Sequence, residues 1–373
     1  MKSTPPSPSH QALSRDLERF RPYSGDPLLV GLFNIFGFRP FLIVGCYTFI
    51  GLGGVIALAV ASGVATPTSP TLVELFEDTG ELLNLGLIVP LGALLVFNFY
   101  NQFTQAVQRL MEDGVLVFTS IADRQSFLEE LEDRLSKAWF APVALAASLA
   151  INVWILVTLK NHWNSLDHGL VAIWFRFLSC INYYMVFMML LKGVATTRAI
   201  RWIFRSDIIL QPIHPDRCGG LQPLGAISGS LNVFLALLTS YITVLVEIEG
   251  IPLSHPGFLT SVLIFLLLAT YLFIAPIAGI HVRMKEMRRG IQISLNREFQ
   301  QCFQQVYQNL SQRTEVHIDS LHRLDTLEKL NRVAAKIPVW PIDMETVLKF
   351  FAVVGVPTLI GLTKTFLLPL FGI

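Results

Sequence analysis

Residues 41–63 have the sequence FLIVGCYTFIGLGGVIALAVASG, which contains no Asp, Glu, Lys or Arg. A helix needs about 20 consecutive apolar residues to cross the hydrocarbon core of a bilayer, which is about 30 Å thick. This stretch is long enough and apolar enough to do so. The sequence therefore predicts a membrane-spanning helix here.

Six further stretches have the same character, and the chain as a whole is 53% hydrophobic and 15% charged. Soluble domains are roughly 25% charged, so water is not the only solvent of this chain. We expect an all-α integral membrane protein with seven transmembrane helices and the lipid bilayer as a partner. The six further spans are expected at 83–103, 139–159, 169–191, 224–246, 258–281 and 346–370.

The charged residues between the spans predict their orientation, because cytoplasmic loops collect Lys and Arg. The loops after the first, third and fifth spans together contain one basic residue, Lys160, whereas the other three loops are rich in Lys and Arg. We therefore expect the N-terminus inside, the C-terminus outside and a location in the inner (plasma) membrane. The basic, cytoplasmic loops are 104–138, 192–223 and 282–345.

The same reasoning divides the chain into five regions. Residues 28–38 are apolar but too short to span, which is typical of an interfacial segment on the inner surface. The net charge of +1 and the lack of a basic run argue against nucleic acid as a partner, and no motif indicates a cofactor. The regions are a mobile cytoplasmic tail (1–27), the interfacial segment (28–38), a six-span bundle (39–281), a cytoplasmic helical region (282–345), and the seventh span with an outer C-terminus (346–373).

Two cytoplasmic segments are expected to be helical. Ser126 and Glu129 form a capping-box pattern at the start of an amphipathic helix, 126–138, whose leucines lie on one side. Residues 283–334 contain no Pro, so the sixth span is expected to continue as a long cytoplasmic helix. Beyond it apolar residues recur every third position, from Ile318 to Val333, which spreads them over several helix faces and favours a helical bundle or a subunit interface.

Four amides share one face of the second span, because they are spaced at i, i+3, i+4 and i+7. Such a face is costly against lipid. It could line a water-filled path, or it could form hydrogen bonds between helices. The four residues are Asn98, Asn101, Gln102 and Gln105.

Two charged residues lie inside predicted spans and need an explanation. Arg176 is in the fourth span, where it either snorkels or pairs with an acid, and Glu247 is an acid near it in depth. Lys364 is in the seventh span together with Thr358 and Thr363. These three residues of the last span are candidates for a permeation path, with snorkelling of Lys364 as the alternative.

The densest polar motif is His214-Pro-Asp-Arg-Cys-Gly-Gly220 in a cytoplasmic loop. His214, Asp216 and Cys218 alternate, so an extended segment would point all three in one direction, and they are metal-ligand types. Asp followed by Gly-Gly also suits a tight turn with positive φ angles. A turn held by the Asp216 side chain, a metal or ligand site, and a catalytic site are the three interpretations.

Two short stretches, RCGGLQPLG (217–225) and PVWPID (338–343), resemble sequences of uncharacterised bacterial multispan membrane proteins, a resemblance that implies no activity. The arrangement of spans and loops resembles that of the insect-chemoreceptor-like seven-helix ion channels. This second resemblance implies a homo-oligomer whose seventh spans line a pore and whose cytoplasmic helices form the interface. Thr358, Thr363 and Lys364 would then be pore residues.

The leading hypothesis is an oligomeric membrane channel or channel-like sensor for ions. A secondary transporter of a small solute is the first alternative, because Pro90, Pro276 and Pro357 interrupt apolar segments. A membrane-embedded enzyme or signalling protein that uses the His214–Gly220 loop is the second. No hydrolase, nucleotide-binding or metalloprotease motif is present, which argues against an enzyme.

Overall fold

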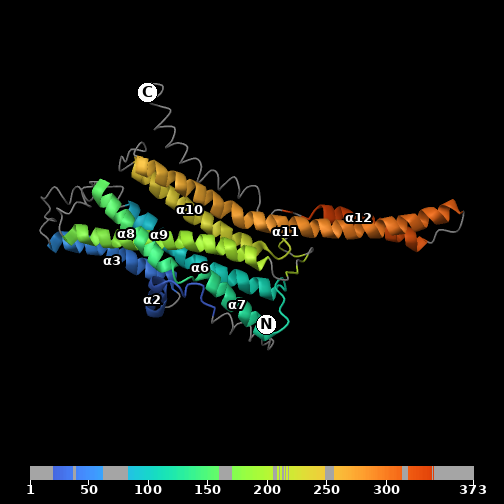
Figure 1. Cartoon of the computed structure of the whole chain (residues 1–373), viewed down its shortest axis with the longest axis horizontal. Coiled ribbons are helices and arrows are strands. Elements are labelled where there is room, and N and C mark those ends of the chain that lie inside the picture. Colours follow the sequence, from blue (N-terminus) through green and yellow to red (C-terminus); the bar gives the residue numbers. More distant parts are fainter. Residues whose placement is uncertain are drawn as a thin grey trace, which may run out of the picture.

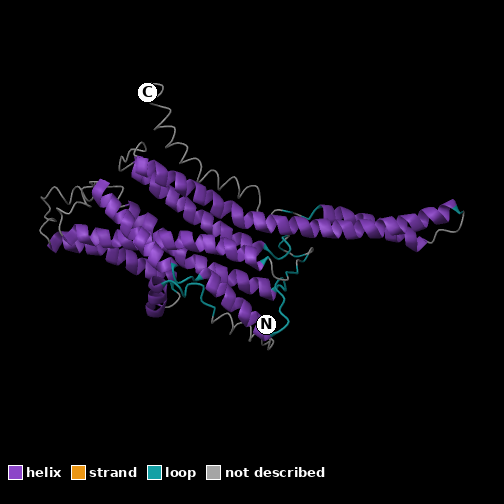
Figure 2. Ribbon diagram, in the orientation of Figure 1, coloured by secondary structure: helices purple, strands orange, loops and turns teal. Residues whose placement is uncertain are grey.

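The computed structural model describes most of the chain between Phe20 and Val339. In this part every regular element is a helix, and the only strand-like feature is a bridge between Leu116 and Ile208 (Figure 2). The all-α expectation is thus confirmed for these residues. The described residues are 20–36, 39–61, 83–158, 170–204, 208–209, 211, 214, 216, 218–247, 256–312, 318–337 and 339.

The helices follow the chain in order and are labelled in Figure 1. A π-helical turn, η1, directly precedes α6. The bounds are α2 Pro27–Phe36, α3 Pro40–Ala61, η1 Asn84–Ile88, α6 Val89–Glu112, α7 Ile121–Leu135, α8 Phe140–Thr158, α9 Leu170–Ile203, α10 Gln222–Glu247, α11 Pro256–Ser311 and α12 Ile318–Ala335.

Five helical stretches in the described residues are long and apolar enough to cross a membrane. They are Pro40–Ala61 (α3), Gly86–Glu112 (the end of η1 and α6), Ile121–Trp154 (α7 and most of α8), Leu170–Ile203 (α9) and Gln222–Thr239 (the first part of α10). Their outer surfaces are apolar, with Phe41 79% and Phe49 80% exposed, as lipid-facing residues would be. These features make the chain a multi-pass membrane protein. The predicted sixth span forms the first part of α11, and the seventh, 346–370, lies outside the described residues. The count of seven and the orientation stay predictions.

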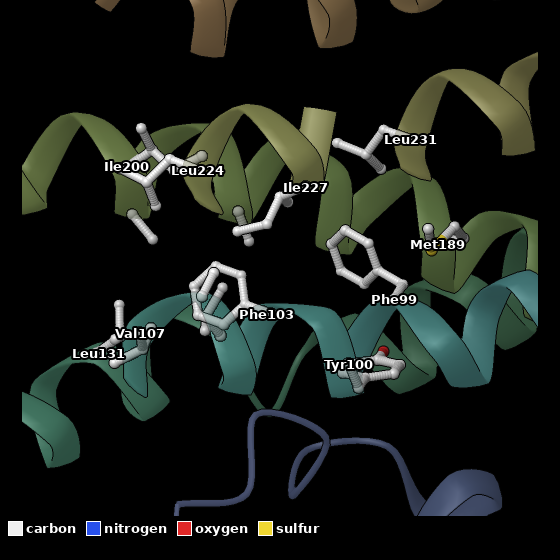
Figure 3. Packing of buried hydrophobic residues seen from close by; sticks show 14 of the residues in the cluster. Phe99, Tyr100, Phe103, Val107, Leu131, Met189, Ile200, Leu224, Ile227 and Leu231 are labelled. Carbon is white, nitrogen blue, oxygen red and sulfur yellow. The ribbon is translucent and has the colours of Figure 1, made fainter. Parts of the chain in front are cut away.

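Helix α6 is the centre of the bundle, because its side chains are buried on several sides. Phe99 points toward α10, where Ile227 and Leu231 are buried, whereas Tyr100 lies on the side of α6 that faces the N-terminal segment (Figure 3). Phe97 packs edge-on against Phe33 of α2 with ring centroids 5.6 Å apart. The N-terminal segment is therefore part of the same core as the long helices.

Helix α11 is the longest element, and its 56 residues extend about 84 Å at 1.5 Å per residue. Its second half leaves the bundle and pairs with α12 as an antiparallel hairpin (Figure 1). We call α11 from Val282 onward, together with α12, the stalk. Glu298 and Arg323 join the two helices at 2.8 Å. The predicted long helix after residue 282 is confirmed as part of α11, while the membrane crossing of its first part stays a prediction.

Three sequence-based boundaries need correction. The amphipathic helix α7 begins at Ile121, because the Ser120 hydroxyl accepts a hydrogen bond from the Asp123 N–H, and Ser126 lies inside the helix. Residues 20–27 are not a mobile tail, since Phe20 and Asp26 are buried in the core. The connection predicted at 192–223 is not a loop throughout, because α9 continues as a helix to Ile203.

Candidate functional site

Lys192 is the most deeply buried charged side chain among the described residues, with 1% of its surface exposed. The fourth-span prediction ended one residue before it and placed it in a loop. In the structure it lies inside α9, between the methionines at 188 and 189 and the buried threonines at 196 and 197. It is about 33 Å along the helix from Leu170, one hydrocarbon thickness from that end.

Three oxygen atoms surround the Lys192 ammonium group. Its Nζ atom donates to the Leu135 carbonyl oxygen at 2.5 Å, the Pro22 carbonyl oxygen at 3.1 Å and the Ser136 Oγ at 3.1 Å. The rings of Tyr100 and Phe140 flank it, with centroids 5.8 and 5.6 Å from Nζ. These contacts satisfy all three donors of an ammonium group.

Asp26 is a buried acid near Lys192. It connects the N-terminal segment, which contains Pro22, to α9 a second time. Its carboxylate accepts the N–H groups of Leu28 at 3.1 Å and Leu29 at 3.3 Å, which caps α2, and the Tyr184 hydroxyl at 3.0 Å. Burial raises the pKa of Asp26 above its ordinary value, although these hydrogen bonds and Lys192 act in the opposite direction. Among the described residues the buried hydroxyl of Tyr100 has no hydrogen-bond partner.

We call this group the Lys192 junction and define it as Pro22, Asp26, Leu135, Ser136, Tyr184 and Lys192. It joins the N-terminal segment, the break between α7 and α8, and α9. Sequence reasoning missed it because its acceptors are mostly backbone carbonyls, which carry no sequence signal. A lysine between apolar residues near the end of a span was the one available hint.

The His214 loop is folded as a turn that docks on the end of α6. The Asp216 carboxylate accepts the N–H groups of Cys218 at 2.8 Å, Gly220 at 3.1 Å and Gln222 at 3.1 Å. Burial raises the pKa of Asp216, but these donors and His214 outweigh it, and the net pKa is lowered. Gly219 and Gly220 have φ angles of 69° and 87°. The geometry favours the turn interpretation.

His214 lies between two carboxylates. Its Nδ1 atom is 2.7 Å from Oδ1 of Asp216 and 3.3 Å from the Asp216 backbone N, and its Nε2 atom is 3.7 Å from Oδ2 of Asp113. Within the described residues, no three His, Cys, Asp or Glu side chains are placed to hold a metal ion. The carboxylate of Asp216 is already occupied by the turn.

The loop contacts its neighbours through backbone and amide groups. The Gln211 amide donates to the Asp113 carbonyl oxygen at 2.6 Å, and the Ile209 N–H donates to the Val115 carbonyl oxygen at 3.0 Å. A depression of about 520 Å³ opens beside the end of α6, and its lining includes Glu112 and Arg124. The turn thus ties the α9–α10 connection to the α6–α7 connection.

The four amides predicted on one face of the second span have different environments in the structure. Gln102 accepts a hydrogen bond from the Ser230 hydroxyl of α10, and Gln105 donates to Asn101 at 3.3 Å on the exposed side of α6. Asn98 is half-buried on the same helix. Gln102 is therefore part of a hydrogen bond between helices, while Gln105 is exposed.

Arg176 lies half-buried on α9, and its Nη1 atom donates to the Asn152 carbonyl oxygen of α8 at 3.4 Å. The side chain of Glu247, its predicted partner, lies outside the described residues, as do Thr358, Thr363 and Lys364. The Arg176–Glu247 pair and the pore candidates of the last span therefore stay predictions.

No protein-family model matches the chain, and neither the curated proteins nor the solved structures contain a match to it. The class of the protein rests on its own features, which are an all-helical fold and several apolar helices of spanning length.

Proposed function

We propose that the protein is an oligomeric membrane channel or channel-like sensor for ions. The observation that supports this best is the surface of the stalk, which exposes apolar side chains outside the apolar bundle. On α11 Phe303 is 51%, Tyr307 64% and Leu310 61% exposed, and on α12 Ile318 is 70% and Leu321 50% exposed. Apolar surface of this kind marks an interaction site.

The pattern of charge on the stalk favours a second copy of the chain as the partner. Between residues 290 and 312 only Arg297 and Glu298 are charged, and Glu298 already pairs with Arg323 of α12. A helix that lies on a membrane surface is rich in Lys and Arg, which this segment is not. A neutral apolar face can join identical subunits without like-charge repulsion, and closed symmetry places a shared axis between them.

A shared axis is where a channel formed by identical subunits has its pore. The chain enters its last apolar run, 346–370, directly after the stalk, so stalk pairing would bring copies of this run near the axis. Thr358, Thr363 and Lys364 are the polar residues we propose for the permeation path. The role of α11 would be to connect the membrane and cytoplasmic parts as one continuous helix.

The first test is the mass of the particle in nanodiscs, for the wild type and a Phe303→Gln/Tyr307→Gln variant. We expect an oligomer for the wild type and monomers for the variant. Ile209→Gln is a matched control, because Ile209 is an apolar residue that is likewise exposed, at 56%, but lies outside the stalk. A monomeric wild type would exclude the shared pore. If the protein forms oligomers that conduct no ions in liposomes, the channel function would be excluded but the oligomeric state would stand.

A secondary transporter is the second candidate, and one observation favours it. The π-helical turn Asn84–Ile88 is followed at once by Pro90, which lacks a backbone N–H, so the entry of α6 is an irregular helix. Interrupted helices of this type form midplane sites in transporters. The test is thermal stabilisation of a monomer by one solute from a panel, which the channel proposal does not predict.

A further inference from the structure

Helix α7 ends at Leu135 and α8 begins at Phe140, so a short break separates the two helices. Ser136 has φ −124° and ψ 54°, and it separates the cytoplasmic helix from the apolar helix that starts at Phe140. The last carbonyls of a helix have no partner within the helix. One of them, Leu135, is bound by Lys192 of α9 instead. A side chain of α9 therefore supplies the cap that the end of α7 lacks.

The N-terminal segment is attached to the same break. The Pro22 carbonyl oxygen accepts hydrogen bonds from both Lys192 and the Ser136 hydroxyl, the second at 2.8 Å. One residue earlier, the Arg21 N–H donates to the Glu132 carboxylate of α7 at 3.2 Å. Residues 20–26 thus lie across the α7–α8 break, with Asp26 bonded to Tyr184 of α9 at the far end.

The burial of Lys192 couples these contacts to one another. A buried ammonium group that loses its acceptors is strongly destabilised unless water enters to replace them. Asp26 and Glu132 are the acids whose charge acts on it, and Tyr100 and Phe140 are the rings beside it. Release of one contact alone leaves Lys192 buried and short of an acceptor, whereas full opening admits water to it, so the arrangement favours either all of the contacts or none.

We propose that the Lys192 junction is a conformational latch, which holds the end of α7, the start of α8 and residues 20–26 on α9 and releases them together. The middle of α7 also contacts α9, where Phe127 stacks on Trp202 with centroids 4.9 Å apart. Opening the latch frees the C-terminal end of α7 and leaves the contact between Phe127 and Trp202 in place. This device goes beyond the proposed function and does not depend on whether the protein conducts ions.

The test is hydrogen exchange, read by mass spectrometry, of the full chain in nanodiscs. Lys192→Met replaces the ammonium group by an apolar group of similar length. We expect exchange in residues 20–26 and 136–140 to rise together by at least tenfold, with α10 unchanged. Lys137→Met is the matched control, because Lys137 is an exposed lysine of the same corner, and we expect no change in either segment.

A second variant separates a latch from independent contacts. Asp26→Ala removes the cap of α2 and the bond to Tyr184 but touches neither Leu135 nor Ser136. A latch that releases as one unit requires exchange in residues 136–140 to rise severalfold in this variant. A rise confined to residues 20–30, or no rise in either segment, would overturn the proposal. This variant keeps the test decisive if Lys192→Met does not fold.

Discussion

The hydroxyl of Ser230 in α10 donates a hydrogen bond to the side-chain oxygen of Gln102 in α6. This bond assigns one of the four amides of the second span to helix packing. Bonds of this kind in membrane proteins contribute about 0.6 kcal/mol on average, because the separated helices also find partners. The energetic role of Gln102 is thus expected to be modest and shared with Ser230.

A double-mutant cycle tests this role. Gln102→Leu and Ser230→Ala should each destabilise the protein by less than about 1 kcal/mol, and their effects should not add, with a coupling near 0.6 kcal/mol. The measurement is the free energy of unfolding in detergent micelles. Gln105→Leu is the control, because Gln105 is exposed and, within the described part of the chain, bonds only to Asn101. A Gln102→Leu variant of full stability that has lost ion conductance would indicate a polar path instead.

Gly220→Ala is expected to disrupt the docking of the His214 turn. Gly220 has a φ of 87°, and a Cβ atom added there would lie 2.3 Å from Cγ2 of Val115. A positive φ alone costs roughly 1–3 kcal/mol for a residue with a side chain. The thermal unfolding midpoint should fall clearly.

Gly229→Ala is the matched control for Gly220→Ala. Gly229 lies inside α10, and a Cβ atom there would meet nothing within 4 Å. Alanine is favoured over glycine in a helix by about 0.5–1 kcal/mol, so this variant should be neutral or slightly more stable. Equal destabilisation by both substitutions would contradict the role of the turn.

Acid is expected to loosen the His214 turn. The pKa of Asp216 is lowered in the folded protein, so its carboxylate contributes stability that is present above the ordinary value of 3.8 and is lost as the pH falls through the lowered pKa. Hydrogen exchange of residues 218–222, corrected for the intrinsic rate at each pH, should therefore increase below about pH 4. In Asp216→Asn this acid-induced increase should be absent. An equal increase in the variant would point to another titrating group.

Trp202→Ala is expected to loosen the contact between α7 and α9. The indole stacks on Phe127, and the guanidinium of Arg134 lies 4.6 Å from its ring centroid. Loss of a half-buried aromatic side chain and a cation–π contact should cost about 2–3 kcal/mol. Protease cleavage within 118–135 should then accelerate. Trp139→Ala is the control, because Trp139 is 50% exposed, and it should leave cleavage unchanged.

The helices were largely predictable because each depends on local sequence. The spans at 41–63, 83–103 and 139–159 coincide with apolar helices of the structure, and the Pro-free segment after residue 282 continues α11. The start of α7 was missed because Ser120 and Ser126 are both plausible caps. Only the hydrogen bond to the Asp123 N–H distinguishes them.

The partners of the polar residues were not predictable in the same way. His214, Asp216 and Cys218 alternate in the sequence, but the Asp216 carboxylate is turned onto backbone N–H groups of its own loop. Nothing in the sequence indicated that the Arg176 guanidinium donates to a backbone carbonyl oxygen of α8, while its predicted pairing with Glu247 stays a prediction. Backbone groups are present at every position, so no residue pattern indicates which of them a side chain will meet.

The sequence by itself determined that this chain is an all-helical membrane protein, because apolar runs of spanning length must satisfy their backbone hydrogen bonds internally. Only the tertiary structure decided that Lys192 belongs to a buried junction. The junction forms because Pro22, 170 residues from Lys192, and Leu135, 57 residues from it, both lie beside α9 in the folded chain. Helix formation depends on hydrogen bonds within a few residues, whereas the environment of a buried charge depends on the packing of distant segments.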